Sequence, residues 1–159
     1  TTMDAVAREV ESDPTYTQII EASRTAKRET VADGIVAAAR EIAETTNVRA
    51  ICCFSESGST ALRVARERPR VPILALTNER ATARRLCLLW GTLTVVVPPV
   101  DRFKAAVVAA VRASLATGLA TEKDIIVVTA GVPFNTPGST NILRVAPCEE
   151  RLIYSGEPE

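Results

Sequence analysis

Short aliphatic runs alternate with helical segments along most of the chain, and this alternation limits the possible folds more than any other feature. Four runs are apolar at consecutive positions and have the length of a buried strand, so we expect strands at 50–54, 73–77, 93–97 and 125–129. Before and between them, amphipathic patterns predict helices at 30–46, 61–68, 79–89 and 101–117. Strands that are apolar on both faces indicate a parallel sheet covered by helices on both sides.

The last connection sets the direction of a fifth strand, expected at 140–145. A parallel crossover needs about 10–12 residues with a helix among them, whereas residues 130–139 contain two glycines and two prolines. The fifth strand should therefore run antiparallel to the fourth, at the edge of the sheet. The predicted fold class is α/β, a three-layer α/β/α domain whose mixed five-stranded sheet has the order 3-2-1-4-5.

Charge and composition exclude several classes of function. The 159 residues carry 19 basic and 19 acidic side chains, so the chain has no basic field for a phosphodiester backbone and we expect no nucleic-acid partner. Histidine is absent, which rules out an imidazole base and the commonest zinc ligand. No apolar run reaches the length of about 18 residues that a membrane span needs, so we expect no membrane partner.

The four cysteines show no CxxC spacing, and we predict no metal site from them. Cys52 and Cys53 are adjacent in an expected strand, where neighbouring side chains point to opposite faces and cannot easily share a ligand. We interpret Cys52, Cys53, Cys87 and Cys148 as buried, reduced thiols of a cytoplasmic protein. The first eight residues show no signal-peptide pattern.

The two ends of the chain differ from its central segment. Residues 2–11 predict an amphipathic helix with Met3, Val6 and Val10 on one face, ended by a Ser-Asp-Pro sequence, and the polar residues 15–28 predict an extended connector. We expect solvated side chains for the carboxylates near the other end, Glu149, Glu150, Glu157 and Glu159. The chain is therefore divided into a helix of a preceding domain at 1–13, a connector at 14–32, an α/β domain at 33–147 and a tail at 148–159.

One loop lies where open α/β sheets bind ligands, beyond the carboxyl end of a strand. It has the sequence SESGST and leads directly into a helix, so its hydroxyls, its glycine and the positive helix end favour a phosphate. A capping role for its serines explains the same pattern, and Glu56 argues against an anion because it adds a carboxylate. The candidate binding residues here are Ser55, Glu56, Ser57, Gly58, Ser59 and Thr60.

A second loop, at 131–138, precedes the fifth strand and is rich in flexible backbone and polar side chains. If the first and fourth strands are neighbours, the two loops meet over one crevice. A simple turn into an edge strand is the alternative interpretation. The candidate binding residues of this loop are Gly131, Pro133, Gly138 and Ser139.

Several segments, in this order, resemble the C-terminal domain of the pyruvate kinase family. The sequence FSESGSTA, followed by VARERP, is similar to a Ser/Thr-rich loop of that family and the helix after it. Later sequence segments of the family are similar to four further stretches of this chain, PILALT, LWG, DIIVVTAGVP and GSTN. The resemblance covers about 33–145, and TMDAVAREVE also resembles the last helix of the family's catalytic barrel.

This resemblance implies a regulatory and oligomerisation domain without catalytic residues of its own. Pyruvate kinases transfer a phosphoryl group from phosphoenolpyruvate to ADP with Mg²⁺ and usually K⁺, and the residues for that reaction belong to a barrel domain, the missing partner of this one. In the family, the Ser/Thr-rich loop grips the phosphate of an allosteric effector and the second loop covers it. The resemblance therefore implies no catalytic residue, metal or cofactor in this chain.

Departures from the family's pattern suggest which effector to expect. Members regulated by fructose bisphosphate have extra basic or aromatic contacts between the third and fourth strands, where this chain offers mainly Arg102, Lys104 and Arg112 on a helix. Since Glu56 also disfavours a bisphosphate, the expected effector is a sugar monophosphate or AMP.

The family is also tetrameric, and we expect a homo-oligomer that pairs through the fifth strand, with interface residues Thr140, Asn141, Ile142, Leu143, Arg144 and Val145. Two alternatives remain, a free-standing phosphometabolite-binding module and a purely structural dimerisation domain. The first helix discriminates between a fragment and a free-standing module, because a fragment should leave Met3, Val6 and Val10 exposed.

Overall fold

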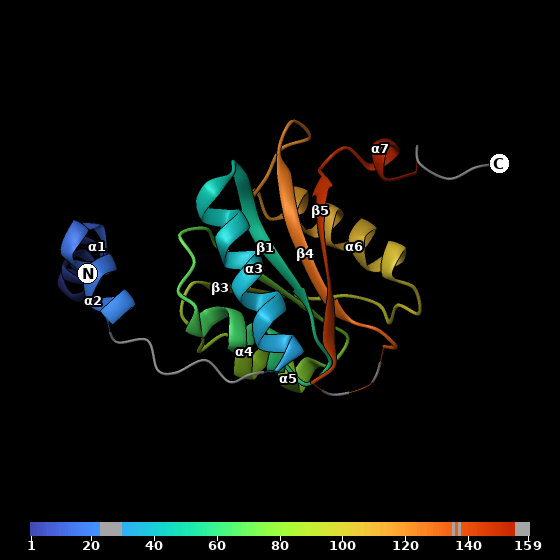
Figure 1. Cartoon of the computed structure of the whole chain (residues 1–159), viewed down its shortest axis with the longest axis horizontal. Helices are drawn as coiled ribbons and strands as arrows, with labels where there is room; N and C mark the ends of the chain where they lie inside the picture. The colour runs from blue at the N-terminus through green and yellow to red at the C-terminus, as the bar shows by residue number, and fades with distance from the viewer. Residues whose placement is uncertain (23–29, 135, 137, 155–159) are drawn as a thin grey trace.

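The computed structural model describes residues 1–22, 30–134, 136 and 138–154, and its centre is a five-stranded sheet. The strands are β1 (Val48–Phe54), β2 (Ile73–Thr77), β3 (Thr92–Val96), β4 (Ile125–Gly131) and β5 (Thr140–Pro147). They lie in the order β3-β2-β1-β4-β5 (Figure 1). All neighbouring strands are parallel except β4 and β5, which are antiparallel. The predicted fold class, strand order and direction of the last strand are confirmed.

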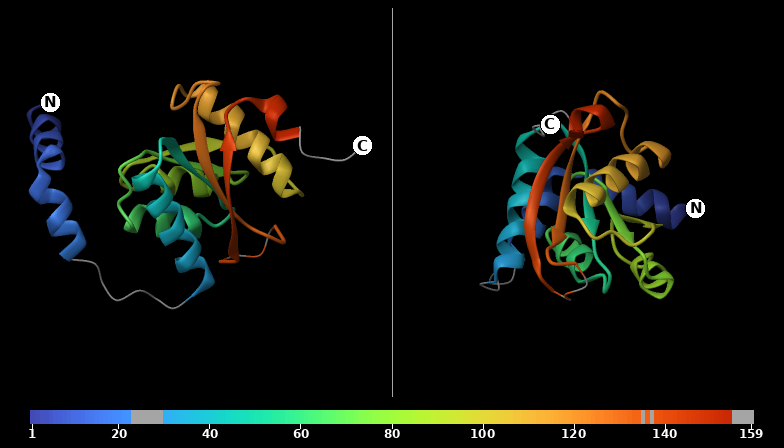
Figure 2. Two further views of the ribbon diagram at one scale, coloured as in Figure 1. Left: turned by 45° about the horizontal axis from the view of Figure 1, so that its top comes forward. Right: turned by 90° about the vertical axis from the view of Figure 1, so that its right-hand side faces the viewer.

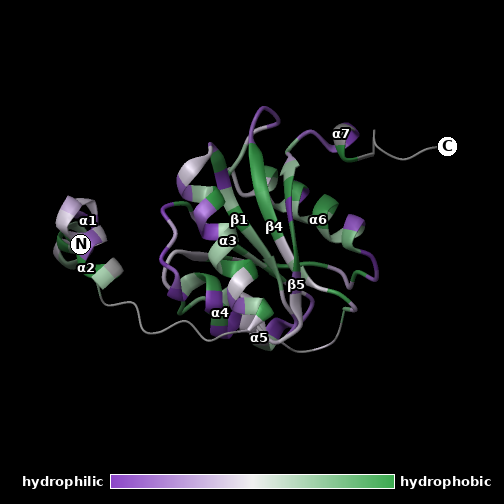
Figure 3. Ribbon diagram, in the orientation of Figure 1, coloured by the Kyte–Doolittle hydropathy of each residue, from purple (hydrophilic) through white to green (hydrophobic). Residues whose placement is uncertain are grey.

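Helices cover both faces of this sheet and complete the three layers. One face carries α3 (Val31–Thr45), α4 (Ser59–Arg66) and α5 (Arg80–Leu86), and the other carries α6 (Phe103–Ala116) and α7 (Glu150–Tyr154). Figure 2 shows the sheet between α3 and α6, and Figure 3 shows hydrophobic strands with hydrophilic residues on the outer helices. Among the described residues, no helix combines the length and apolar character needed to cross a bilayer.

The cysteines follow the layers of the fold. Cys52 packs in the cluster under α6 and Cys53 in the cluster under α3, so the prediction that they point to opposite faces is confirmed. Burial raises the pKa of each to about 12, and it raises the pKa of Cys148 to about 11. The prediction of burial is wrong for Cys87, which is exposed because it is the C-cap of α5 on the outer surface of the helix.

The first segment consists of two helices, α1 (Thr2–Ser12) and α2 (Pro14–Ala22). The predicted extended conformation is therefore wrong for 15–22, while residues 23–29 lie outside the described part of the chain. The reason lies at the junction: the Asp13 carboxylate accepts a hydrogen bond from the Thr15 N–H at 2.7 Å, and proline suits the first position of a helix. The Ser-Asp-Pro sequence thus ends one helix and starts the next.

The apolar stripe of α1 is exposed. Met3, Val6 and Val10 have exposed fractions of 85%, 57% and 53%. A polar contact joins α1 to the α/β domain, since Trp90 Nε1 donates to Glu11 Oε1 at 2.8 Å. The Arg68 guanidinium lies 4.7 Å from the centre of the Trp90 ring. The described residues of the α/β domain therefore do not cover the apolar stripe of α1.

The segment after β5 packs against the domain. Glu150 begins α7 and accepts hydrogen bonds from Arg112 of α6, with Nε to Oε2 at 3.0 Å, and these bonds lower the pKa of the Glu150 carboxyl. Ile153 is buried in the same layer, and Glu149 pairs with Arg151. Glu149 and Glu150 keep exposed fractions of 31% and 37%, so they are partly solvated as expected, but both are also ion-paired. Glu157 and Glu159 lie outside the described residues.

Candidate functional site

A pocket opens at the carboxyl ends of β1 and β4, and both predicted loops line it. The first loop contributes Ser55, Glu56, Ser57, Ser59 and Thr60, and the second contributes Gly131, Thr136, Gly138 and Ser139. The loops meet because β1 and β4 are parallel neighbours whose ends lie at the same edge of the sheet. Gly58 and Pro133, also proposed from the sequence, are not among the residues that line the pocket.

The first loop makes a tight turn into α4. Gly58 is the N-cap with φ +83°, and a Cβ at this position would lie 3.0 Å from Leu86 Cδ2, so the turn requires glycine. Ser55 Oγ accepts from the Gly58 N–H at 3.0 Å, and Ser57 Oγ accepts from the Ser59 N–H at 3.4 Å. Both serines therefore stabilise the turn, and each hydroxyl keeps a proton that it can donate to a ligand.

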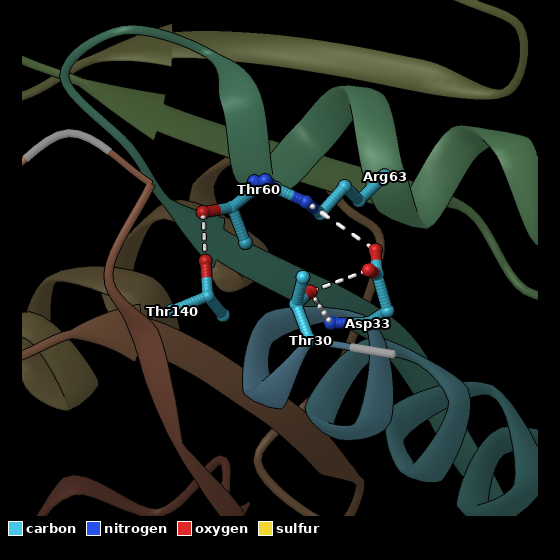
Figure 4. Close-up of polar contacts among 5 residues, drawn as sticks. All are labelled: Thr30, Asp33, Thr60, Arg63 and Thr140. Carbon is cyan, nitrogen blue, oxygen red and sulfur yellow. Dashed lines mark hydrogen bonds and ion pairs between the residues drawn. The ribbon is translucent and has the colours of Figure 1, made fainter. Parts of the chain in front are cut away.

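Two side-chain contacts hold α4 against its neighbours (Figure 4). Thr60 Oγ1 lies 2.6 Å from Thr140 Oγ1, which joins the start of α4 to the start of β5. Arg63 Nε lies 3.5 Å from an oxygen of Asp33 in the first turn of α3, where Thr30 Oγ1 caps the helix by accepting from the Asp33 N–H at 3.2 Å. The first loop therefore leads into α4, a helix that is held by contacts with both β5 and α3.

The second loop is held at both ends. The Asn141 side chain accepts from the Val132 N–H at 2.9 Å and donates to the Val132 carbonyl at 2.6 Å, next to a cis peptide bond at Pro133. A Cβ on Gly131 would lie 2.9 Å from the carbonyl carbon of Ser139, so the two ends of the loop approach each other as closely as glycine allows. The loop is therefore narrow at its base.

One wall of the pocket is apolar. The rings of Phe54 and Phe134 meet edge to face with their centroids 6.1 Å apart, and Pro99 and Val100 line the pocket beside them. Among the described residues that line the pocket, the only charged side chain is that of Glu56. Any attraction for an anion must therefore come from hydroxyls, backbone N–H groups and the positive end of α4.

Comparison with known proteins gives the family. Residues 33–146 match the family model described as "Pyruvate kinase, alpha/beta domain". The chain belongs to this family. It is 39% identical over 145 residues to a pyruvate kinase of Methylorubrum extorquens, covering 91% of this chain and 30% of that protein, and 41% identical over 143 residues to one of Agrobacterium vitis, covering 90% and 30%. The chain thus spans less than a third of the length of these relatives.

A solved structure agrees with the family match. The fold is similar to part of "Cryptosporidium parvum pyruvate kinase in complex with ADP", with a TM-score of 0.73 and 27% identity, covering 84% of this chain and 27% of that one. The resemblance recognised in the sequence is therefore confirmed, and the chain is the C-terminal α/β part of a pyruvate kinase.

The proposed interface residues lie on the edge strand of this pyruvate kinase domain. Asn141 and Val145 are exposed, whereas Ile142, Leu143 and Arg144 are half-buried. Thr140 differs from the rest, because its side chain is 2% exposed, bonds to Thr60 and lines the pocket. From the sequence, Thr140 is predicted only as an interface residue, because its position in the pocket depends on the contact between the start of β5 and Thr60 of α4.

Sequence reasoning also missed several residues of the pocket. Asn78 follows β2 as Ser55 follows β1, so the rule that strand ends gather at one edge could have identified it. Phe134 and Thr136 lie inside the second loop without a distinctive pattern, and Pro99 and Val100 come from the connection after β3. Unlike Asn78, these four residues were not identifiable without the fold.

Proposed function

We propose that this domain is the allosteric-effector-binding and oligomerisation domain of a pyruvate kinase. The observation that carries the proposal is the pocket in which the Ser/Thr-rich turn of α4 faces the loop before β5. A phosphate there would accept hydrogen bonds from the first-turn N–H groups of α4 and from the hydroxyls of Ser55, Ser57 and Thr60. The helix dipole favours its charge.

The preferred effector is a sugar monophosphate or AMP. Glu56 is exposed at the pocket and would repel a second phosphate, whereas a sugar hydroxyl could donate to its carboxylate. Phe134 and Phe54 provide an apolar wall for the uncharged part of such a molecule. The described residues that line the pocket include no arginine or lysine, which supports a singly phosphorylated ligand over a bisphosphate.

The whole enzyme would transfer a phosphoryl group from phosphoenolpyruvate to ADP, giving pyruvate and ATP in cytoplasmic glycolysis. Its active site would lie in a barrel domain, with α1 as the last barrel helix at 1–13 and 14–32 as the connector. The exposed stripe of Met3, Val6 and Val10 supports this, because an amphipathic helix needs a surface to cover its apolar face. This chain alone should therefore not catalyse the reaction.

Mg²⁺ and K⁺ would bind with the reactants in the barrel domain. The described residues bring together no group of three or more His, Cys, Asp or Glu side chains that could bind a metal. We therefore derive no step through a metal in this domain.

Oligomerisation would use β5. An edge strand exposes unpaired backbone groups that a second copy can pair with across a twofold axis, and a homotetramer then follows from a second twofold interface elsewhere in the enzyme. Asn141 and Val145 have exposed side chains on this strand. A purely structural dimerisation domain is the second candidate, and it is favoured by the capping bonds that Ser55 and Ser57 already make.

Calorimetric titration with ribose 5-phosphate, glucose 6-phosphate, AMP and fructose 1,6-bisphosphate tests the proposal. We expect a monophosphate to bind and the bisphosphate to bind more weakly. Glu56→Gln should improve binding of the bisphosphate more than that of the monophosphate. Glu122→Gln, which lies before the amino end of β4 while the pocket is at its carboxyl end, should change neither. If none of the four compounds binds at millimolar concentration, the structural alternative is correct.

A further inference from the structure

We propose that Arg85 is a positioning residue of the pocket, which holds the Ser57–Gly58 peptide bond so that the Ser57 carbonyl points away from a bound anion. This inference rests on the proposed function. Arg85 lies on α5, outside the loops that the sequence singled out, and it is not among the residues that line the pocket. Its effect on a ligand would therefore pass through the backbone of the turn.

The Ser57–Gly58 peptide is bound on both sides by side chains of two different elements. On one side, Arg85 Nη2 donates to the Ser57 carbonyl oxygen at 2.9 Å and to Thr82 Oγ1 at 3.3 Å. On the other side, the Gly58 N–H donates to Ser55 Oγ at 3.0 Å. Because a trans peptide is planar, its carbonyl and N–H point in opposite directions, so these two bonds define a single orientation of the unit.

Glycine at the N-cap makes this orientation vulnerable. Gly58 has φ +83°, and glycine has access to more of conformational space than any other residue, so the peptide before it can rotate at low steric cost. A rotated peptide would direct the Ser57 carbonyl toward the N-terminus of α4. Its negative partial charge would then face the oxyanion that the helix end attracts.

The packing of α5 places Arg85 where it can prevent this rotation. A Cβ on Gly58 would lie 3.0 Å from Leu86 Cδ2 and 3.2 Å from Thr82 Cγ2, so α5 is in direct contact with the turn. Thr82 and Leu86 are buried, and they fix the helix that carries Arg85. The packing of α5 therefore holds the Arg85 guanidinium next to the Ser57 carbonyl.

A long-range effect of positive charge is the competing explanation, and Arg84 offers a matched control. Arg84 and Arg85 are adjacent on α5, are both exposed and carry the same charge. Substituting either one removes one positive charge near the pocket. Only the substitution of Arg85 removes the hydrogen bond to the Ser57 carbonyl.

The test uses the full 159-residue chain with ribose 5-phosphate and inorganic phosphate as probes. We expect Arg85→Met to weaken binding of ribose 5-phosphate about 5- to 10-fold, as loss of one hydrogen bond to a positioned group would. Arg84→Met should stay within about twofold of wild type. Arg85→Lys keeps the charge and a donor, so its affinity for ribose 5-phosphate should lie between those of wild type and Arg85→Met. If Arg85→Met does not fold, Arg85→Lys takes its place in the test.

A second measurement needs no ligand. In the free protein, Arg85→Met should speed hydrogen exchange of the Gly58 N–H and shift its NMR resonance, because the peptide is then held on one side only, whereas Arg84→Met should leave both unchanged. Equal losses of affinity for the two variants, or an unchanged Gly58 resonance in Arg85→Met, would overturn the inference. If wild type binds none of the four compounds of the calorimetric titration, the proposed function fails, and the Gly58 measurement still shows whether Arg85 orients the peptide.

Discussion

The hydroxyls of Thr60 and Thr140 lie 2.6 Å apart although 80 positions separate the two residues in the sequence. Thr60 is in the first turn of α4, and Thr140 is the first residue of the edge strand β5. Both side chains are buried, with exposed fractions of 3% and 2%. The turn that we propose to bind an effector and the strand that we propose to pair with a second copy are therefore joined by one buried hydrogen bond.

Removing one hydroxyl of this pair should destabilise the fold. Thr140→Val leaves the Thr60 hydroxyl buried without its partner, which should lower the free energy of unfolding by about 1–3 kcal/mol. The double variant Thr60→Val/Thr140→Val should cost less than the two single variants together, because no hydroxyl is then left unpaired. Urea unfolding measures these values. Thr45→Val at the exposed end of α3 is the control, expected within about 0.5 kcal/mol of wild type, and strictly additive losses would contradict the coupling.

Ser57→Ala should weaken binding of a phosphate-bearing ligand. The Ser57 hydroxyl lines the pocket, and its charge-assisted hydrogen bond to a phosphate should contribute about 1–2 kcal/mol to affinity. Calorimetry with ribose 5-phosphate gives the dissociation constant. Ser12→Ala, on the exposed surface of α1, is a control that should leave it unchanged. The same dissociation constant for Ser57→Ala and wild type would refute the role of Ser57 as a ligand contact.

Two glycine-to-alanine substitutions should change stability in opposite directions. Gly131→Ala places a Cβ 2.9 Å from the carbonyl carbon of Ser139, so the base of the second loop must open, at a cost of about 1–3 kcal/mol. Gly34→Ala meets no atom within 4 Å inside α3 and should stabilise the protein by about 0.4–1 kcal/mol. Thermal unfolding of both variants tests this. A neutral Gly131→Ala would show that the loop is not held as narrowly as described.

The thiols should differ in reactivity. Burial raises the pKa of Cys52 and Cys53 to about 12 and that of Cys148 to about 11, so these thiols stay protonated at pH 8 and are shielded from reagents. Cys87 is exposed. Iodoacetamide at pH 8 should therefore modify one cysteine in the folded protein and all four in urea, as mass spectrometry can count. In Cys87→Ser, the folded protein should remain unmodified, and rapid labelling of Cys52 would contradict the described core.

The successes and failures of sequence reasoning have physical causes. Continuous apolar runs predicted the buried strands β1, β2 and β4, because a parallel sheet covered on both faces buries nearly every side chain of such a run, whereas the run that forms β3 lies at the edge of the sheet and is only half-buried. The sequence did not predict α2, because Asp13 ends one helix through its backbone N–H, which donates to the Val10 carbonyl, and caps the next through its carboxylate. The ion pair of Glu150 was not predictable, because its partner Arg112 lies on a helix 38 positions earlier in the sequence.

By itself, the sequence determined the strands of the sheet and the helices between them, the antiparallel last strand and the composition of both loops, since these depend on side-chain periodicity, turn residues and the length of a connection. Only the tertiary structure decided that the loops line one pocket, that Thr140 belongs to that pocket as well as to the edge strand, and that Arg85 reaches the Ser57 carbonyl. The reason is that each of these contacts joins residues of separate elements, and the distance between them is set by how the helices pack on the sheet.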